Sequence, residues 1–236
     1  MIDYSKFLNN SIQEIKPSGI RKFFDIASEM DDVISLSIGE PDFQTPWHIR
    51  EEGINSLKNG KTWYSPNRGF AQLREEIANY YARRFNISYE GKTQVLVTVG
   101  GSEAIDLAFR CLVSEGDEVI IPEPSFVCYE PLTHMAGGKA VIINTKAEDQ
   151  FRLKADDLEK AITDKTKLVV LPFPNNPPGA IMEKADLEAI AEVIKKHDLF
   201  VLSDEIYCEL TYGGKNHISI AAIDGMYERT VVINGF

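Results

Sequence analysis

Paired cysteines and clustered metal ligands are lacking in this sequence of 236 residues. The cysteines are far apart, without metal-ligand or disulfide spacing, and we expect them to be buried, reduced thiols; they are Cys111, Cys128 and Cys208. The histidines are equally scattered, which argues against a zinc site and against a histidine-led catalytic triad; they are His48, His134, His197 and His217. Surface or core roles are expected for all four histidines.

Long apolar runs and an excess of basic residues are lacking as well. No run is long enough to cross a bilayer, and the N-terminal segment has neither the basic nor the apolar part of a signal peptide. We therefore expect a cytoplasmic protein that does not bind a membrane. The formal net charge of −11 argues against a nucleic-acid-binding surface, although a local basic pocket for a small anion stays possible. Small-molecule chemistry is favoured.

The residues that are present have the composition of a soluble globular protein, with 44% hydrophobic and 26% charged side chains in one large or two smaller domains. Short β-branched runs alternate with helical patterns, which indicates a parallel sheet covered on both faces. The predicted strands are 94–99, 118–122, 140–144, 167–173, 199–204 and 230–235, and the helices between them are 102–114, 125–136, 155–163 and 183–197. Upstream we expect helices at 20–30, 47–59 and 70–86, and a short strand and turn within 33–43.

Three polar segments directly follow predicted strands. They are residues 100–104, 176–179 and 204–207. Open α/β sheets bind their ligands beyond the carboxyl ends of the strands, and these ends meet at one edge when neighbouring strands are parallel. We therefore expect the three segments to converge on one site.

The first segment opens with the glycine pair Gly100-Gly101, which ends a strand and begins a helix. The free amides of the helix's first turn, with the positive end of the helix dipole behind them, would form a cradle for an anion, and Ser102 would add a hydroxyl. Ser102 is alternatively the helix N-cap, with Glu103 favourable in the first turn. The spacing is not G-x-G-x-x-G, so the nicotinamide-type fingerprint is absent.

The third segment begins with Asp204, which follows an apolar strand and is expected to be nearly buried, where a carboxylate requires a partner. One possible partner is the backbone, with Asp204 or Ser203 capping a helix over 205–210. The other is a protonated ring nitrogen on a ligand, held by a direct ion pair. On a helical turn, Tyr207 would project from the same face as Asp204.

The second segment lies in the stretch LPFPNNPPGA, residues 171–180, whose prolines and glycine stiffen the exit from a strand. Proline fixes its own φ and favours extended geometry in the residue before it, so Asn176 is held extended with its amide projecting from the loop. A plain turn accounts for such a loop as well as a binding site does.

Together, six segments resemble the class I/II aminotransferases, which are pyridoxal-phosphate enzymes of fold type I. The segments are SLSIGEPDF (35–43), YSPNRGFAQLREEIA (64–78), VGGSEAIDLAF (99–109), PEPSFVCYEP (122–131), the N-P-x-G loop (176–179) and SDEIY (203–207). The resemblance covers nearly the whole chain. It implies the α/β fold of that type, with a mostly parallel sheet flanked by helices. Residues 1–45 would form an N-terminal arm and part of a small domain, and residues 46–236 the cofactor-binding large domain.

The resemblance also implies roles for residues that bind pyridoxal 5'-phosphate. Gly101, Ser102 and Glu103 correspond to the turn that binds the cofactor phosphate. Phe126 corresponds to the aromatic residue that stacks on the pyridine ring, although an ordinary core position remains an alternative for this residue.

Three further residues correspond to partners of polar atoms on the cofactor ring. Asn176 and Tyr207 match the residues that hydrogen-bond the phenolic oxygen, and Asp204 matches the aspartate that pairs with the ring nitrogen. We expect all three to be catalytic residues, because they control the electron-accepting capacity of the ring.

Tyr64 and Gly39 have implied roles outside this set. Tyr64 resembles the tyrosine that reaches the phosphate from a neighbouring subunit, which implies a homodimer with shared active sites. Gly39 resembles the glycine whose backbone approaches the substrate carboxylate, although a tight-turn glycine is the alternative.

The resemblance implies a Schiff-base lysine just beyond Phe236 and, later in the chain, arginines that bind phosphate and the substrate carboxylate, so we expect a longer protein. The resemblance implies an aminotransferase that moves an amino group between an amino acid and a 2-oxo acid. A carbon–sulfur lyase with the same cofactor is one alternative. A non-catalytic cofactor-binding sensor is another, disfavoured by a start at Met1 without a helix-turn-helix region. Ser102 stands where some aspartate-using relatives have lysine, which slightly disfavours a strictly acidic donor.

Overall fold

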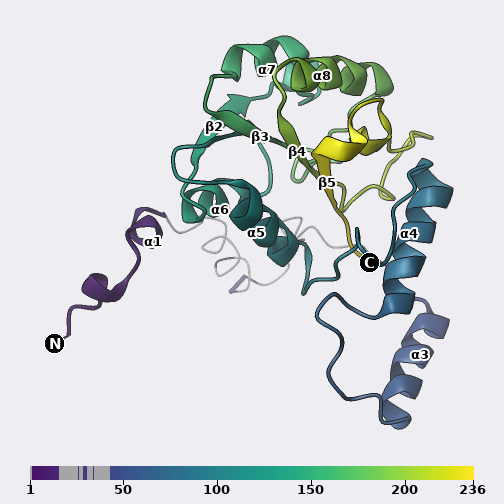
Figure 1. Cartoon of the computed structure of the whole chain (residues 1–236). Coiled ribbons are helices and arrows are strands. Elements are labelled where there is room, and N and C mark those ends of the chain that lie inside the picture. The colour runs from purple at the N-terminus through teal and green to yellow at the C-terminus, as the bar shows by residue number, and fades with distance from the viewer. Residues whose placement is uncertain (1, 16–25, 27–28, 31–33, 35–42) are drawn as a thin grey trace.

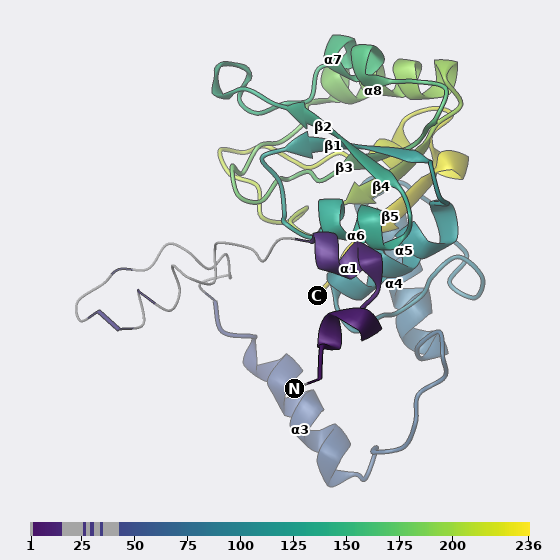
Figure 2. The same ribbon diagram turned by 90° about the vertical axis from the view of Figure 1, so that its left-hand side faces the viewer.

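The computed structural model describes residues 2–15, 26, 29–30, 34 and 43–236. At the N-terminus, these include a short 3₁₀ turn at Tyr4–Phe7 and helix α1 (Asn10–Glu14), which lies beside α6 in Figure 2. Most of the predicted helix at 20–30 and of the strand and turn within 33–43 lies outside the described residues. Gly39 lies outside them too.

A five-stranded parallel sheet forms the centre of the molecule (Figure 1). Its strands are β1 (Glu118–Glu123), β2 (Lys139–Asn144), β3 (Thr166–Leu171), β4 (Phe200–Asp204) and β5 (Thr230–Ile233), in the order β2-β1-β3-β4-β5. All four pairings are parallel. The central strands β1, β3 and β4 are almost entirely buried, because helices cover both faces.

The two faces of the sheet build two hydrophobic cores. Helices α7 (Ala155–Ala161) and α8 (Lys184–Lys196) cover one face, and α5 (Gly101–Leu112) and α6 (Tyr129–Met135) cover the other (Figures 1 and 2). On β3, Val169 packs in the α8 core with Ile190, whereas its neighbour Val170 packs in the α5 core with Phe109. Adjacent residues of a strand point to opposite faces, so this alternation confirms the predicted parallel sheet with two covered faces.

Helices α3 (Trp47–Lys58) and α4 (Ala71–Phe85) confirm two upstream predictions. Tyr81 and Phe85 of α4 form a third apolar cluster with Cys208 and Ala221, which ties α4 to the segment that follows β4. In the described part of the chain, α3 has no buried residue, and it lies away from the sheet in both views. The division into domains at residue 45 stays a prediction.

Residues 94–99 differ from the prediction of a strand. They form no ladder with a described strand, although the amide of Val97 donates to the carbonyl of Arg68 at 3.2 Å, and β5 is an edge of the sheet. Leu96 is 54% and Val99 is 91% exposed. A strand requires a hydrogen-bonded neighbour, and the apolar run alone does not supply one.

Two predicted helices also differ. The helix expected over 125–136 begins only at Tyr129, and residues 124–128 form the turn that carries Phe126. The helix expected over 205–210 is a turn, because the amide of Glu205 donates to the carbonyl of Ile233 and the amide of Ile206 donates to the side chain of Asp204. These bonds fix the segment in a different geometry.

The cysteine prediction is wrong in one case. Cys111 is exposed on α5, whereas Cys128 is partly buried and Cys208 is buried; all three are free thiols. Within the described residues, no group of histidine, cysteine and carboxylate side chains has the arrangement of a metal site. None of the helices described is both long and apolar enough to span a membrane.

Candidate active site

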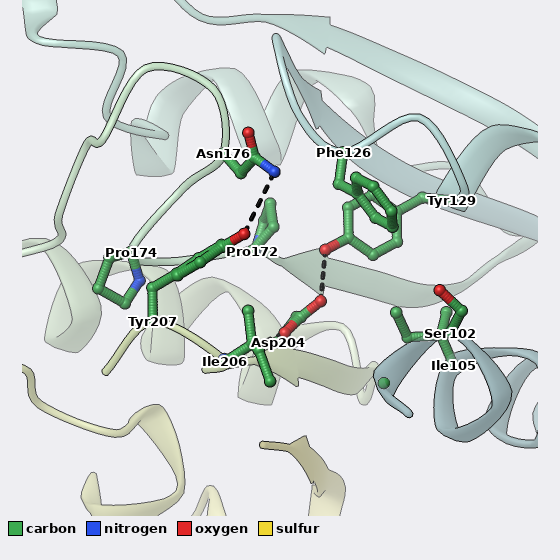
Figure 3. Close-up of a pocket in the computed structure, with 11 residues that line it drawn as sticks. Ser102, Ile105, Phe126, Tyr129, Pro172, Pro174, Asn176, Asp204, Ile206 and Tyr207 are labelled. Carbon is green, nitrogen blue, oxygen red and sulfur yellow. Dashed lines mark hydrogen bonds between the residues drawn. The ribbon is translucent and has the colours of Figure 1, made fainter. Parts of the chain in front are cut away.

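A pocket of about 180 Å³ lies at the carboxyl ends of β3 and β4, beside the first turn of α5. Figure 3 shows the side chains that line it. Six predicted site residues are among them: Gly101, Ser102, Phe126, Asn176, Asp204 and Tyr207. The structure therefore brings together all three polar segments that follow the predicted strands, at the edge where a parallel sheet binds ligands.

Asp204 is the last residue of β4 and is only 7% exposed. Its Oδ2 accepts a hydrogen bond of 2.7 Å from the hydroxyl of Tyr129, and its Oδ1 accepts one of 3.2 Å from the amide of Ile206. Burial raises the pKa of Asp204, the two hydrogen bonds lower it in part, and the neighbouring carboxylate of Glu205 raises it again. The carboxylate therefore lies in a pocket that favours a cationic partner.

The alternative in which the partner of Asp204 is the nearby backbone is correct in part. Oδ1 accepts from an amide two residues on, but in a turn and not at the start of a helix. The other oxygen is directed into the pocket, toward Tyr129 (Figure 3). One residue thus caps a turn and lines the pocket.

Asn176 and Tyr207 approach each other from two different loops. The side-chain amide of Asn176 donates to the hydroxyl of Tyr207 over 3.4 Å, which is a long hydrogen bond. Both side chains are half-buried and face the same part of the pocket (Figure 3). A ligand oxygen placed between them would receive donors from both.

The loop that carries Asn176 is held by its neighbour Asn175, which the sequence analysis did not single out. The amide of Asn175 donates to the carbonyl of Ala180 at 2.9 Å, and the amide of Gly179 donates to the carbonyl of Asn175 at 2.7 Å. The buried side chain of Asn175 donates to the carbonyl of Pro124, at 2.9 Å. The loop is therefore closed on itself and tied to the turn that carries Phe126.

The first turn of α5 forms one wall of the pocket. Gly100 is its N-cap and has a φ of 85°, a left-handed conformation that favours glycine. Among the described residues, no side chain caps α5, so Ser102 is not the N-cap and the first-turn amides of this 12-residue helix remain available. Glu103 does not line the pocket, since its carboxylate accepts from the amide of Val99.

Phe126 and Tyr129 form the aromatic wall. Their ring centroids are 6.2 Å apart at an interplanar angle of 82°, and Phe126 is 39% exposed while Tyr129 is 2% exposed. Burial and the contact with Asp204 raise the pKa of Tyr129, so its hydroxyl stays protonated and donates. Sequence reasoning missed Tyr129, although it stands three residues after Phe126 in the segment 122–131.

Tyr64 lies apart from this group. It is fully exposed in the connection between α3 and α4 and does not line the pocket.

An open sheet with polar groups at its carboxyl edge, beside a helix that begins at a glycine pair, is the arrangement of α/β proteins that bind small anionic ligands.

The chain belongs to the class I and II aminotransferases, because the model of the family "Aminotransferase class I and II" matches residues 31–236. It is 52% identical over 232 residues to the Bacillus subtilis protein YugH, named only as an aminotransferase; the match covers 98% of this chain and 60% of that protein. It is 45% identical to "Aromatic-amino-acid aminotransferase 2" of Thermococcus litoralis, over 97% of this chain and 59% of the relative.

A solved structure agrees with these matches. The aspartate aminotransferase of Thermus thermophilus with maleate superimposes with a TM-score of 0.90 at 37% identity, over 97% of this chain and 60% of that structure. This confirms the predicted fold. The chain spans about 60% of the length of the curated relatives it matches.

Enzymes of this family depend on pyridoxal 5'-phosphate, and the residues of the pocket fit that group. The uncapped first turn of α5 suits its phosphate, and the exposed face of Phe126 suits its flat ring. The buried carboxylate of Asp204 suits a protonated ring nitrogen, and the pair Asn176 and Tyr207 suits a ring oxygen.

Proposed function

We propose that the protein to which this chain belongs is a pyridoxal-phosphate-dependent aminotransferase, which moves an amino group between an amino acid and a 2-oxo acid. One observation carries the proposal. The buried carboxylate of Asp204 lines the same small pocket as the available amides at the start of α5, at the edge of the sheet where ligands bind.

Each lining residue then has a defined task. When bound, the cofactor supplies an electron-accepting ring that weakens bonds at the α-carbon of an amino acid. Asp204 holds the proton on the ring nitrogen, and Tyr129 keeps the aspartate ionised and oriented through its 2.7 Å hydrogen bond. Asn176 and Tyr207 donate to the ring oxygen, and their loops hold them in place before the reaction.

The remaining contacts bind the cofactor without taking part in proton transfer. The amides of Gly101 and Ser102, with the Ser102 hydroxyl, bind the phosphate, and the ring of Phe126 packs on one face of the pyridine. The carboxylate of Glu103 supports this turn through its contact with the Val99 amide, and the backbone amide of Glu103 is proposed to belong to the phosphate site.

The base of the reaction is proposed to be a lysine beyond Phe236. The end of β5 supports this position, because Ile233 is the register partner of Asp204 and lies beside the first turn of α5. Residues that continue after β5 therefore leave the sheet next to the pocket. The intact protein is expected to have a mass clearly above the 26.5 kDa of this chain.

The site is proposed to be shared between two subunits of a cytoplasmic homodimer. Full exposure of Tyr64, away from the pocket of its own chain, supports a role at the phosphate of a neighbouring subunit. Gly39 is proposed to approach the substrate carboxylate, as part of a small domain that includes residues 1–45. No nucleic acid or membrane takes part.

The amino donor is proposed to be an aromatic amino acid or aspartate, since two relatives that are each 45% identical to this chain are named for these donors. Of the two, the serine at position 102 slightly disfavours the acidic donor. Full-length protein mixed with pyridoxal phosphate should gain the absorbance of bound cofactor and should convert 2-oxoglutarate to glutamate with one of these donors. Release of ammonia without glutamate would indicate a lyase. A colourless protein after addition of the cofactor would overturn the proposal.

A further inference from the structure

The side-chain amide of Asn234 makes three hydrogen bonds where the chain leaves β5. Its oxygen accepts from the backbone amide of Gly235 at 2.8 Å. Because a backbone amide only donates, the oxygen of Asn234 faces it and the side-chain nitrogen faces the other way. That nitrogen donates to the hydroxyl of Tyr81 at 2.9 Å and to the sulfur of Cys208 at 3.3 Å. Both hydrogens of the nitrogen are therefore used.

The two acceptors are buried and belong to different elements. Tyr81 of α4 is 5% exposed, and Cys208, in the turn after β4, is 1% exposed. Both belong to the third apolar cluster. Burial raises the pKa of the Tyr81 hydroxyl and of the Cys208 thiol, so both groups are neutral around pH 7. One side chain of Asn234 thus joins β5 to α4 and to the turn after β4.

The residues on either side of Asn234 lie beside the pocket. Ile233, before it, is the register partner of Asp204. Gly235, after it, is so close to Ile206 that a Cβ at position 235 would lie 2.5 Å from Cδ1 of Ile206, which lines the pocket (Figure 3). Asn234 itself does not line the pocket. A shift of Asn234 would therefore reach the pocket through its neighbours.

Cys208 extends this connection to the turn that carries Tyr207. It directly follows Tyr207, and its amide donates to the carbonyl of Glu205 at 2.9 Å. The amide of Glu205 in turn donates to the carbonyl of Ile233 at 2.8 Å. The bond from Asn234 to Cys208 thus adds a side-chain restraint where the backbones of the turn and of β5 already meet.

We propose that Asn234 is a positioning residue, which fixes the direction in which the chain leaves β5 so that the lysine proposed beyond Phe236 reaches the pocket. The inference rests on the proposed function, because this lysine is the base of the proposed reaction. The physical reason is orientation. A reacting group that is held in place reacts faster than one that must first find its position, and a displacement of about 1 Å costs about a hundredfold in rate.

The test uses the full-length protein and two ligands. Pyridoxal phosphate has an aldehyde, which a lysine amine captures as a carbon–nitrogen double bond with release of water, and borohydride reduces that bond to a stable single bond. The rate of capture is measured from the intact mass of protein reduced after successive times. Pyridoxamine phosphate lacks the aldehyde, so its dissociation constant reports the pocket without the lysine.

Asn234→Ala should slow capture of pyridoxal phosphate about ten- to a hundredfold. Its dissociation constant for pyridoxamine phosphate should stay within about threefold of the wild type, because the lining residues are unchanged. Tyr81→Phe and Cys208→Ala each remove one acceptor and should each slow capture by less. In the double variant of Asn234→Ala and Tyr81→Phe the two effects should not add, because both changes remove the same hydrogen bond.

The matched control is Asn79→Ala. The side chain of Asn79, also on α4, donates to Glu76 at 3.3 Å, and neither residue lines the pocket. This variant should capture pyridoxal phosphate at the wild-type rate. Cys208→Ser, which keeps an acceptor beside Asn234, should stay closer to the wild-type rate than Cys208→Ala does.

Two results would overturn the proposal. The first is a folded Asn234→Ala variant that captures pyridoxal phosphate at the wild-type rate. The second is an equal loss of capture and of affinity for pyridoxamine phosphate, which would give Asn234 a purely structural role. If Asn234→Ala does not fold, Tyr81→Phe and Cys208→Ala carry the test, and wild-type capture in both overturns the proposal.

Failure of the proposed function gives a different result, which the wild-type protein alone reveals. A wild-type protein that binds pyridoxamine phosphate but captures no pyridoxal phosphate would overturn the proposed lysine, and the role of Asn234 with it. Capture by the wild type that is independent of Asn234 would overturn the role of Asn234 and leave the lysine in place.

Discussion

The hydroxyl of Tyr129, on the first residue of α6, donates a 2.7 Å hydrogen bond to the carboxylate of Asp204 at the end of β4. The two residues are 75 positions apart in the sequence, and both are buried. The bond lowers the pKa of a carboxyl group whose pKa burial raises. It therefore links the position of α6 to the charge of the pocket.

Replacement of Tyr129 by phenylalanine should weaken cofactor binding. The change removes a hydrogen bond to a charged acceptor, which contributes about 1.5–3 kcal/mol, so the dissociation constant for pyridoxal phosphate should rise roughly ten- to a hundredfold. The absorbance titration of full-length protein measures it. Tyr212→Phe, the same change at a residue that is 85% exposed and does not line the pocket, is the comparison and should leave the dissociation constant unchanged. Equal affinity in wild type and Tyr129→Phe would show that this bond has no role.

The apoprotein should become more stable when Asp204 is replaced by asparagine. Burial raises the pKa of Asp204 in the folded state, so folding at neutral pH includes the cost of a buried charge. That cost is fully present above the folded-state pKa, decreases as the pH falls through it, and is absent below the ordinary pKa of 3.8. Melting temperatures without cofactor should therefore be higher for Asp204→Asn at pH 7 and equal to wild type in acid.

The same substitution should nearly abolish activity. Asparagine keeps the shape but cannot hold a proton on the ring nitrogen, and the loss of one preorganised electrostatic group costs about a hundredfold or more in kcat. Asp204→Glu, which keeps the charge, should retain more activity than Asp204→Asn. An asparagine variant with wild-type kcat would contradict the role assigned to this residue.

Sequence patterns predicted the sheet and the convergence of three segments because both follow from local periodicity and from the rule that ligands bind at carboxyl ends. They missed Tyr129 because its bond to Asp204 joins two distant elements. They placed a strand at 94–99, which forms no ladder with any strand of the described chain. They also placed a helix at 205–210, where bonds to Ile233 and Asp204 fix a turn.

Glycine at position 100 should be required, whereas glycine at position 53 should not. Gly100 has a φ of 85°, so an alanine there costs about 1–2 kcal/mol and displaces the amides at the start of α5. Gly53 lies inside α3, and no atom lies within 4 Å of the place that a Cβ would take, so alanine there should stabilise the protein by about 0.5–1 kcal/mol. Denaturant unfolding measures the stability of each variant, and the absorbance titration with pyridoxal phosphate measures its affinity for the cofactor. Tolerance of alanine at position 100 would contradict the geometry described for this turn.

The two adjacent asparagines should behave differently. Asn175→Ala removes the bond to the carbonyl of Pro124 and should lower the free energy of unfolding by about 1–3 kcal/mol. Asn176→Ala removes a half-buried amide whose bond is 3.4 Å long, so it should change stability little and should instead shift the absorbance maximum of bound cofactor. Thermal melts and spectra distinguish these effects, and the reverse pattern would assign the binding role to Asn175.

The most direct measurement is a crystal structure of the full-length protein with pyridoxal phosphate. The ring nitrogen is predicted to lie within about 3 Å of a carboxylate oxygen of Asp204, with the phosphate on the amides that open α5. A cofactor bound elsewhere, or one whose ring nitrogen faces away from Asp204, would contradict the assignment of this pocket.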